Sequence, residues 1–125
     1  MRLSSILTAV TAIGLLGAPA HAQKATEVFI PIGQSPGVSG LSSVIGAVES
    51  CDQASRVITI STEKERHTAM LTDETAIYLD RSAAKKGGAV GSRSDCQKGR
   101  RIEVKYVYQG GKRTTRAEWI KIQSD

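Results

Sequence analysis

The sequence predicts an all-β protein, built as a small antiparallel barrel of five or six strands. The chain has 125 residues, of which 40% are hydrophobic and 23% charged, and this size and composition suit one small folded domain. Short runs of β-branched residues recur between residues 44 and 122, and tight turns join most of them. Large side chains are few, with aromatic residues at 4%, and closing the sheet into a barrel removes the exposed edges that an open sheet would leave.

Residues 1–22 have the features of a cleavable signal peptide. Arg2 precedes an apolar run over residues 3–17, and Ala20-His21-Ala22 forms a small-residue cleavage site. An uncleaved membrane anchor is the alternative, but the apolar run is shorter than the roughly 20 residues that span a bilayer. We therefore predict cleavage after Ala22, a periplasmic or secreted protein, and no membrane span after cleavage.

Residues 23–43 are predicted to form an extended arm that leads into a barrel domain over residues 44–125. Residues 28–32 are apolar, whereas residues 33–40 are rich in glycine, serine and proline and favour turns. The glycines do not form a phosphate-binding loop, because neither a lysine-serine pair nor a helix pattern follows them.

The first two strands are predicted as a hairpin over residues 44–50 and 56–62. Residues 52–55 between them favour a turn, and in the second run Ile58 and Ile60 alternate with polar residues.

A charged turn at residues 63–66 then leads to a third strand at residues 67–71. A further short strand is predicted at residues 76–79. Residues 81–94 carry a cluster of glycines and are expected to form a long loop.

The strand at residues 101–108 has the clearest alternation in the chain. Gly110 and Gly111 mark a hairpin turn, and residues 114–122 complete the set of strands. Trp119 is expected on the opposite side of this last strand from its isoleucines, partly exposed. The side chains predicted to share one face of the earlier strand are Ile102, Val104, Tyr106 and Tyr108.

Several of these segments together resemble small exported bacterial β-barrel domains of unknown function, which are similar in outline to OB-fold or SH3-like barrels. The resemblance covers residues 44 to 122, rests on turn and core positions, and implies a fold more than an activity. The segments that carry it are Gly46-x-Val48, Ile58-Thr59-Ile60, Leu71 to Thr75, Asp95 to Val104 and Ala117 to Ile122.

Cys51 and Cys96 are the only cysteines, and export to an oxidising compartment favours a disulfide between them. In the resembling domains the position of Cys96 is usually leucine, which implies a place near the core. Two thiols remain an alternative. A metal or redox site is another, although with His67 the cysteines make at most three ligands and lack the close spacing of zinc sites. No metal and no cofactor are expected.

Enzymatic signatures are missing, so we expect a protein that is not an enzyme. His67 is the single histidine after the predicted cleavage site, and no nucleophile stands at a recognisable spacing from it. Asp73 and Glu74 are adjacent carboxylates, but neighbours in a turn usually point apart.

The charge is distributed unevenly along the chain. Residues 23–80 hold 4 basic and 8 acidic side chains, whereas residues 81–125 hold 12 basic and 4 acidic. If the basic loops share one end of the barrel, they form a patch that attracts phosphates or acidic polysaccharides. The alternative is solvated loop charge. The candidate anion-binding residues are Arg81, Lys85, Lys86, Arg93, Lys98, Arg100, Arg101, Lys112, Arg113 and Arg116.

Three functions remain open on this basis. The first is an exported, non-enzymatic binding or accessory module of the bacterial envelope, whose basic loops engage an unknown protein or an anionic polymer. The second is a nucleic-acid-binding barrel, for which export is unfavourable. Its only support is the net charge of +4 after removal of residues 1–22 and the pair Tyr106 and Tyr108, which suits base stacking but suits core packing better. The third is an assembly subunit in which residues 28–32 add a strand to a neighbour.

Overall fold

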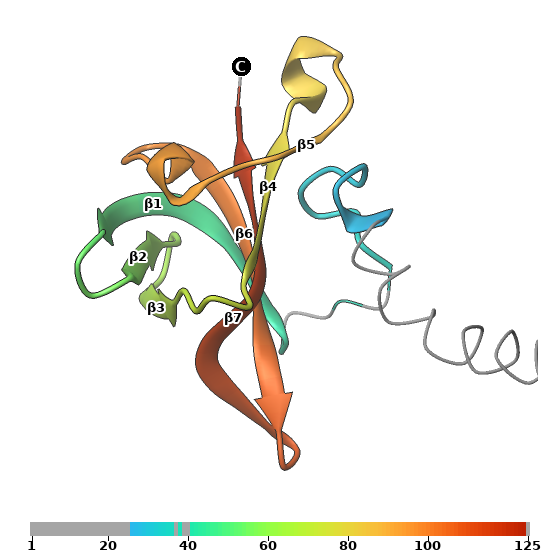
Figure 1. The fold of residues 1–125 in the computed structure, drawn as a ribbon. Helices are drawn as coiled ribbons and strands as arrows, with labels where there is room; N and C mark the ends of the chain where they lie inside the picture. The colour runs from blue at the N-terminus through green and yellow to red at the C-terminus, as the bar shows by residue number, and fades with distance from the viewer. Residues whose placement is uncertain (1–25, 37, 39–40, 125) are drawn as a thin grey trace, which may run out of the picture.

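A computed structural model describes residues 26–36, 38 and 41–124 (Figure 1). The predicted signal peptide lies outside the described residues. No described helix is both long enough and apolar enough to cross a membrane. In chain order the elements are β1 (Ser43–Asp52), β2 (Val57–Ser61), β3 (Arg66–Met70), β4 (Ala76–Asp80), the 3₁₀ turn η1 (Ser82–Ala84), β5 (Ala89–Val90), the 3₁₀ turn η2 (Arg93–Asp95), β6 (Arg101–Gln109) and β7 (Lys112–Gln123).

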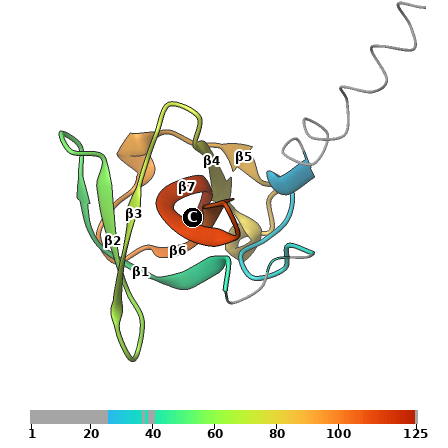
Figure 2. The ribbon, with the colours of Figure 1, turned by 90° about the horizontal axis from the view of Figure 1, so that it is seen from below.

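Five of the strands close into a barrel in the order β3-β2-β1-β6-β7 (Figure 2). Neighbouring strands in this series are antiparallel, and the barrel closes through a parallel contact of β3 with β7 at Met70 and Arg116. The predicted small barrel is thus confirmed. In an OB-type barrel the third and the last strand pair in parallel, as β3 and β7 do here.

The predicted strands lie within or overlap β1, β2, β3, β4, β6 and β7. At the β6–β7 hairpin, Gly110 and Gly111 have φ angles of 61° and 76°. Two consecutive residues with positive φ match the right-handed twist of the strands they join, which is why glycine occupies both positions. The predicted loop at residues 81–94 contains η1, η2 and the two-residue strand β5. β4 lies outside the barrel, paired in parallel with the second half of β7.

Aliphatic side chains from all five barrel strands fill the interior. Because side chains alternate across a strand, each barrel strand contributes every second residue to this core. Its fully buried members are Ile58, Ile60, Ile102, Val104, Ile120 and Ile122.

Of the two tyrosines expected on one face of β6, only Tyr106 is buried. Tyr106 is 2% exposed, whereas Tyr108 is 46% exposed. Between these two residues the partner in β7 changes from Ala117 to Arg113, so the extra residues of this irregularity are in β7, and Tyr108 lies close to the hairpin turn.

The described part of the N-terminal arm consists of successive turns that pack on the outside of the barrel. Residues 26–36 lie beside β4 and β5 in Figure 1 and Figure 2. Ile32 is 5% exposed, and the Val28 carbonyl packs closely against Gly88. We call residues 26–36 the docked segment.

Replacing Gly88 tests this docking. A Cβ atom there would collide with the backbone of Val28 and lie 3.3 Å from the Leu79 carbonyl oxygen. We expect Gly88→Ala to displace the docked segment, to lower the free energy of unfolding by about 2 kcal/mol and to shift the emission of Trp119 to longer wavelength. Gly87→Ala is the matched control, because a Cβ atom there meets nothing within 4 Å. Equal stability of the two variants would contradict the packing described here.

Candidate functional site

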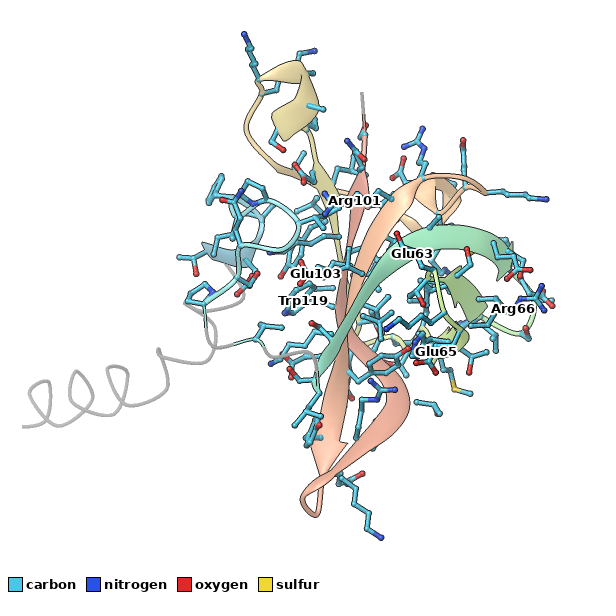
Figure 3. All side chains as sticks on the ribbon, turned by 180° about the vertical axis from the view of Figure 1, so that it is seen from behind. Glu63, Glu65, Arg66, Arg101, Glu103 and Trp119 are labelled. Atoms are coloured by element: carbon cyan, nitrogen blue, oxygen red, sulfur yellow. The ribbon has the colours of Figure 1, made fainter. Side chains whose placement is uncertain are left out.

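The outer side of β4, β6 and β7 carries a cluster of polar and aromatic side chains beneath the docked segment. Alternation directs these residues away from the barrel core, yet all of them are buried. Figure 3 shows Glu103 and Trp119 side by side between the barrel strands and the docked segment. The members of this set, which we call the covered face, are Tyr78, Asp80, Glu103, Trp119 and Lys121.

Lys121 is the centre of the covered face. Its Nζ donates hydrogen bonds to Glu27 Oε1 at 2.8 Å and to Ser35 Oγ at 2.6 Å, both in the docked segment. The same nitrogen lies 4.6 Å from the ring centroid of Trp119, within reach of a cation–π interaction. The Lys121 side chain is 1% exposed and that of Glu27 is 15% exposed, so this ion pair is shielded from solvent.

Two carboxylates of the covered face bind the backbone of the docked segment. The Ile32 N–H donates to Asp80 Oδ2 at 2.9 Å, and the Gly33 N–H donates to Glu103 Oε1 at 2.9 Å. Burial by itself raises the pKa of Asp80, but hydrogen bonds from Ser82 and Ile32 and the nearby charge of Arg101 hold that pKa below its ordinary value. Asp80 therefore remains ionised at neutral pH as an acceptor for the docked segment.

Sequence reasoning did not find the covered face. It expected Trp119 to be partly exposed, and the structure corrects this to 2% exposed, with the Lys121 ammonium over its ring. Lys121 and Trp119 alternate with Ile120 and Ile122, so their outward direction is visible in the sequence. Their partners are not visible in the sequence, since Glu27 is 94 positions away from Lys121 along the chain.

The basic candidate residues divide between the two ends of the barrel. The loops at residues 81–88 and 91–100 lie at the end where β6 begins, whereas the β6–β7 hairpin is at the opposite end (Figure 1). We call the first group the basic end. It contains Arg81, Lys85, Lys86, Arg93, Lys98, Arg100 and Arg101.

The other three candidates, Lys112, Arg113 and Arg116, lie on the β6–β7 hairpin. Arg113 lies 4.4 Å from the ring centroid of Tyr106, and Arg116 donates a hydrogen bond to the side chain of Gln109. The buried Tyr106 hydroxyl donates to the Thr68 carbonyl at 2.8 Å. This tyrosine is therefore unavailable as a stacking platform for a base.

Cys51 and Cys96 are neighbours in space. Both are thiols in the structure, Cys96 buried and Cys51 half-buried, and they lie within hydrogen-bonding distance of each other. Burial, together with the neighbouring Cys51, raises the pKa of the Cys96 thiol well above its ordinary range. The proximity that a bridge requires is present, and the disulfide itself stays a prediction.

Intact mass of the exported protein tests the bridge. We expect protein recovered from its own host to begin at Gln23 and to gain two alkyl groups only after reduction, because an oxidising compartment joins adjacent thiols. A Cys51→Ser variant provides the control and should gain one group without reduction. Two groups gained without reduction would contradict the bridge, and a mass that includes residues 1–22 would contradict the predicted cleavage.

An open groove of about 780 Å³ lies beside β1, next to the turn between β2 and β3. It is outside the covered face, although a Cβ atom on Gly33 would reach within 3.6 Å of Ile45 at its border. The charged residues around the groove carry both signs. Its lining residues are Ile45, Gly46, Ala47, Ser61, Thr62, Glu63, Lys64, Glu65, Gly99 and Arg101.

The remaining titratable candidates are placed at the surface of the barrel. His67 Nε2 lies 3.9 Å from Glu65 Oε1 in the same hairpin, and Asp73 accepts a hydrogen bond from Arg56 at 2.7 Å. Glu74 is exposed in the turn after β3. Among residues 26–36, 38 and 41–124, histidine, cysteine and carboxylate side chains form no group of three that could hold a metal ion.

Comparison with known proteins gave one structural likeness to report. No family model matches the chain, and no curated protein matches it. The structure is similar to that of a Cu(II) form of CusF from Escherichia coli in which a tryptophan is replaced by alanine. The sequences are 18% identical, the match covers 66% of this chain and 91% of that chain, and the TM-score is 0.44. Assignment of the fold therefore rests on the strand pairing described above.

Proposed function

We propose that this protein is an exported, non-enzymatic binding or accessory module of the bacterial envelope, and that its basic end engages an anionic partner. The partner is an unidentified protein or an envelope polymer. The leader-like residues 1–22 support export, and the absence of a recognisable catalytic pattern in the sequence supports a binding role.

One observation carries the proposal. None of the seven basic side chains at the basic end forms an ion pair with another described residue. The ion pairs among described residues involve Arg56, Arg66, His67, Lys105 and Lys121 instead. Cations that form no ion pair concentrate positive potential at one end of a small barrel, which favours and accelerates the approach of an anionic surface.

Salt-dependent retention on heparin tests the proposal. We expect the mature chain to bind at low salt and to lose affinity steeply as salt rises, because bound counterions are released from a polyanion. Lys98→Gln should lower the slope of log affinity against log salt by about one, whereas Lys112→Gln at the opposite end should leave the slope unchanged. Equal slopes for Lys98→Gln and the unaltered protein would argue against the basic end as the contact surface.

A nucleic acid is the second anionic partner to compare. Single-stranded DNA competing better than heparin would favour the nucleic-acid-binding alternative, although burial of Tyr106 removes half of the aromatic pair on which it depended.

Strand addition by residues 28–32 would require this segment to leave the barrel, since Ile32 is held there by Asp80. Unchanged oligomer mass in light scattering after deletion of residues 23–40 would argue against that alternative.

A further inference from the structure

On the side where it pairs with β2, β1 extends beyond the end of β2. It pairs with β6 through Ser43–Ala47 and with β2 from Ala47 to Asp52. β2 ends at Ser61, opposite Ala47, and the chain then turns away towards β3. Among the described strands, none pairs with the β2-facing edge of β1 ahead of Ala47. This part of β1 therefore has an open edge, and the groove described above lies along it.

The backbone of Ile45 points towards this open edge. Antiparallel strands bond through alternate residues, and two hydrogen bonds show which residues of this stretch bond to the neighbouring strand. The Tyr106 N–H donates to the Ser42 carbonyl at 2.9 Å, and the Val48 N–H donates to the Arg100 carbonyl at 2.9 Å. Residues with even numbers thus face β6, so the N–H and carbonyl of Ile45 face the groove.

The two sides of the groove carry opposite charges. Arg101 lies at one side with Gly99, and Glu63 and Glu65 lie on the β2–β3 turn. Neither Arg101 nor Glu63 forms an ion pair with a described residue. Figure 3 views the molecule from the side on which β1 lies in front and labels both residues.

We propose that this groove binds an extended peptide segment of a partner protein by strand addition to β1. The peptide backbone pairs with Ile45, an acidic side chain of the peptide meets Arg101, and a basic one meets Glu63 and Glu65. A volume of about 780 Å³ suits such a segment, because ligand sites fall within roughly 300–1,000 Å³. A polyanion is a poorer occupant, since two carboxylates would repel it. The proposal does not depend on the anionic partner of the basic end.

Nuclear magnetic resonance of the mature chain, labelled with ¹⁵N, tests this site directly. The probes are the capped peptides Ac-Lys-Thr-Val-Thr-Val-Glu-NH2 and Ac-Glu-Val-Thr-Val-Thr-Lys-NH2, which present the two charges in either direction. An uncharged peptide with glutamine at both ends is the control. We expect one charged peptide to shift the amide resonances of Ile45, Ala47 and Gly99 in a saturable way, with a Kd below about 1 mM. It should also slow hydrogen exchange of the Ile45 amide by at least about fivefold, because strand addition satisfies that N–H.

Charge-swapped variants test whether the charged side chains of the groove recognise the charged ends of the peptide. Arg101→Glu and Glu63→Lys should each weaken binding of the preferred peptide by at least about fivefold, and the double variant should prefer the peptide of opposite direction. Glu74→Lys, an equal charge change in a turn outside the groove, should leave binding unchanged. Because Glu63 is exposed in a turn, Glu63→Lys keeps the test informative if Arg101→Glu fails to fold.

Three results would overturn the proposal. They are the absence of saturable shifts at Ile45 with either charged peptide, equal affinity for the uncharged peptide, and equal or larger shifts of the Ile45 amide with a heparin fragment. Each of these is distinguishable from failure of the anionic-partner proposal, which is measured by the salt slope of Lys98→Gln on heparin.

Discussion

Lys121→Ala is expected to lower the free energy of unfolding by about 3 kcal/mol, a large fraction of the stability of a domain of this size. The substitution leaves Glu27 without its cationic partner in a solvent-shielded position and removes the cation from the face of Trp119. The docked segment can escape this penalty only by leaving the barrel, which exposes Trp119 and Glu103. The decrease in the free energy of unfolding therefore measures how strongly the docked segment is held on the barrel.

Urea unfolding followed by tryptophan fluorescence measures this effect. Trp119 is the only tryptophan, so a red shift of native-state emission reports departure of the docked segment. Glu27→Gln and the double variant complete a thermodynamic cycle, in which the two single effects should not add because the residues are in contact.

Lys105→Ala is the matched control for Lys121→Ala. Lys105 forms an ion pair with Glu118 at 2.9 Å, but these side chains are 29% and 33% exposed. An accessible pair of this kind contributes roughly 0–1 kcal/mol. Similar losses of stability for Lys105→Ala and Lys121→Ala would show that the buried pair does not hold the docked segment.

Gly46→Ala is expected to lower the free energy of unfolding by a similar amount, about 3 kcal/mol, because it overpacks the closed barrel. A Cβ atom on Gly46 would collide with the backbone carbonyl of Ser61 and lie 2.9 Å from Ile60 Cγ2. Both residues belong to β2, which pairs with β1 from Ala47 onward. Since β1 is also paired with β6, it cannot move away from β2 without disturbing its pairing on the other side.

Thermal or urea unfolding, with hydrogen exchange of the β1 and β2 amides, measures the effect of Gly46→Ala. Exchange should accelerate first where β1 meets β2. Gly87→Ala is again the control, because it introduces the same methyl group in open space. A stability of Gly46→Ala within about 0.5 kcal/mol of the unaltered protein would mean that β1 and β2 are less closely packed than described.

The strands were predictable because their signals are local. Alternation of Ile58 and Ile60, and of Ile120 and Ile122, places these side chains in the core, as each strand independently directs every second residue inwards. Gly110 and Gly111 similarly specify their hairpin without reference to the rest of the chain. The exception is Tyr108, which is exposed near the hairpin turn although alternation groups it with core residues.

The candidate sites were less predictable. The sequence identified the basic residues, but whether their loops share one end depends on the direction in which β6 and β7 cross the barrel. The proximity of Cys51 and Cys96 likewise depends on how the end of β1 meets the turn η2. Predicting the groove would have required the relative lengths of β1 and β2, because its open edge begins where Ser61 ends the shorter strand.

The sequence by itself determined the class of fold and the position of each barrel strand, because alternation and turn chemistry act between residues that are close along the chain. Only the tertiary structure decided that residues 26–36 pack on the barrel and that Lys121 is buried with Glu27. The physical reason is that burying a charge is favourable only beside a compensating partner. Folding brings that partner from a distant part of the chain, and no periodic pattern in the sequence records such a pairing.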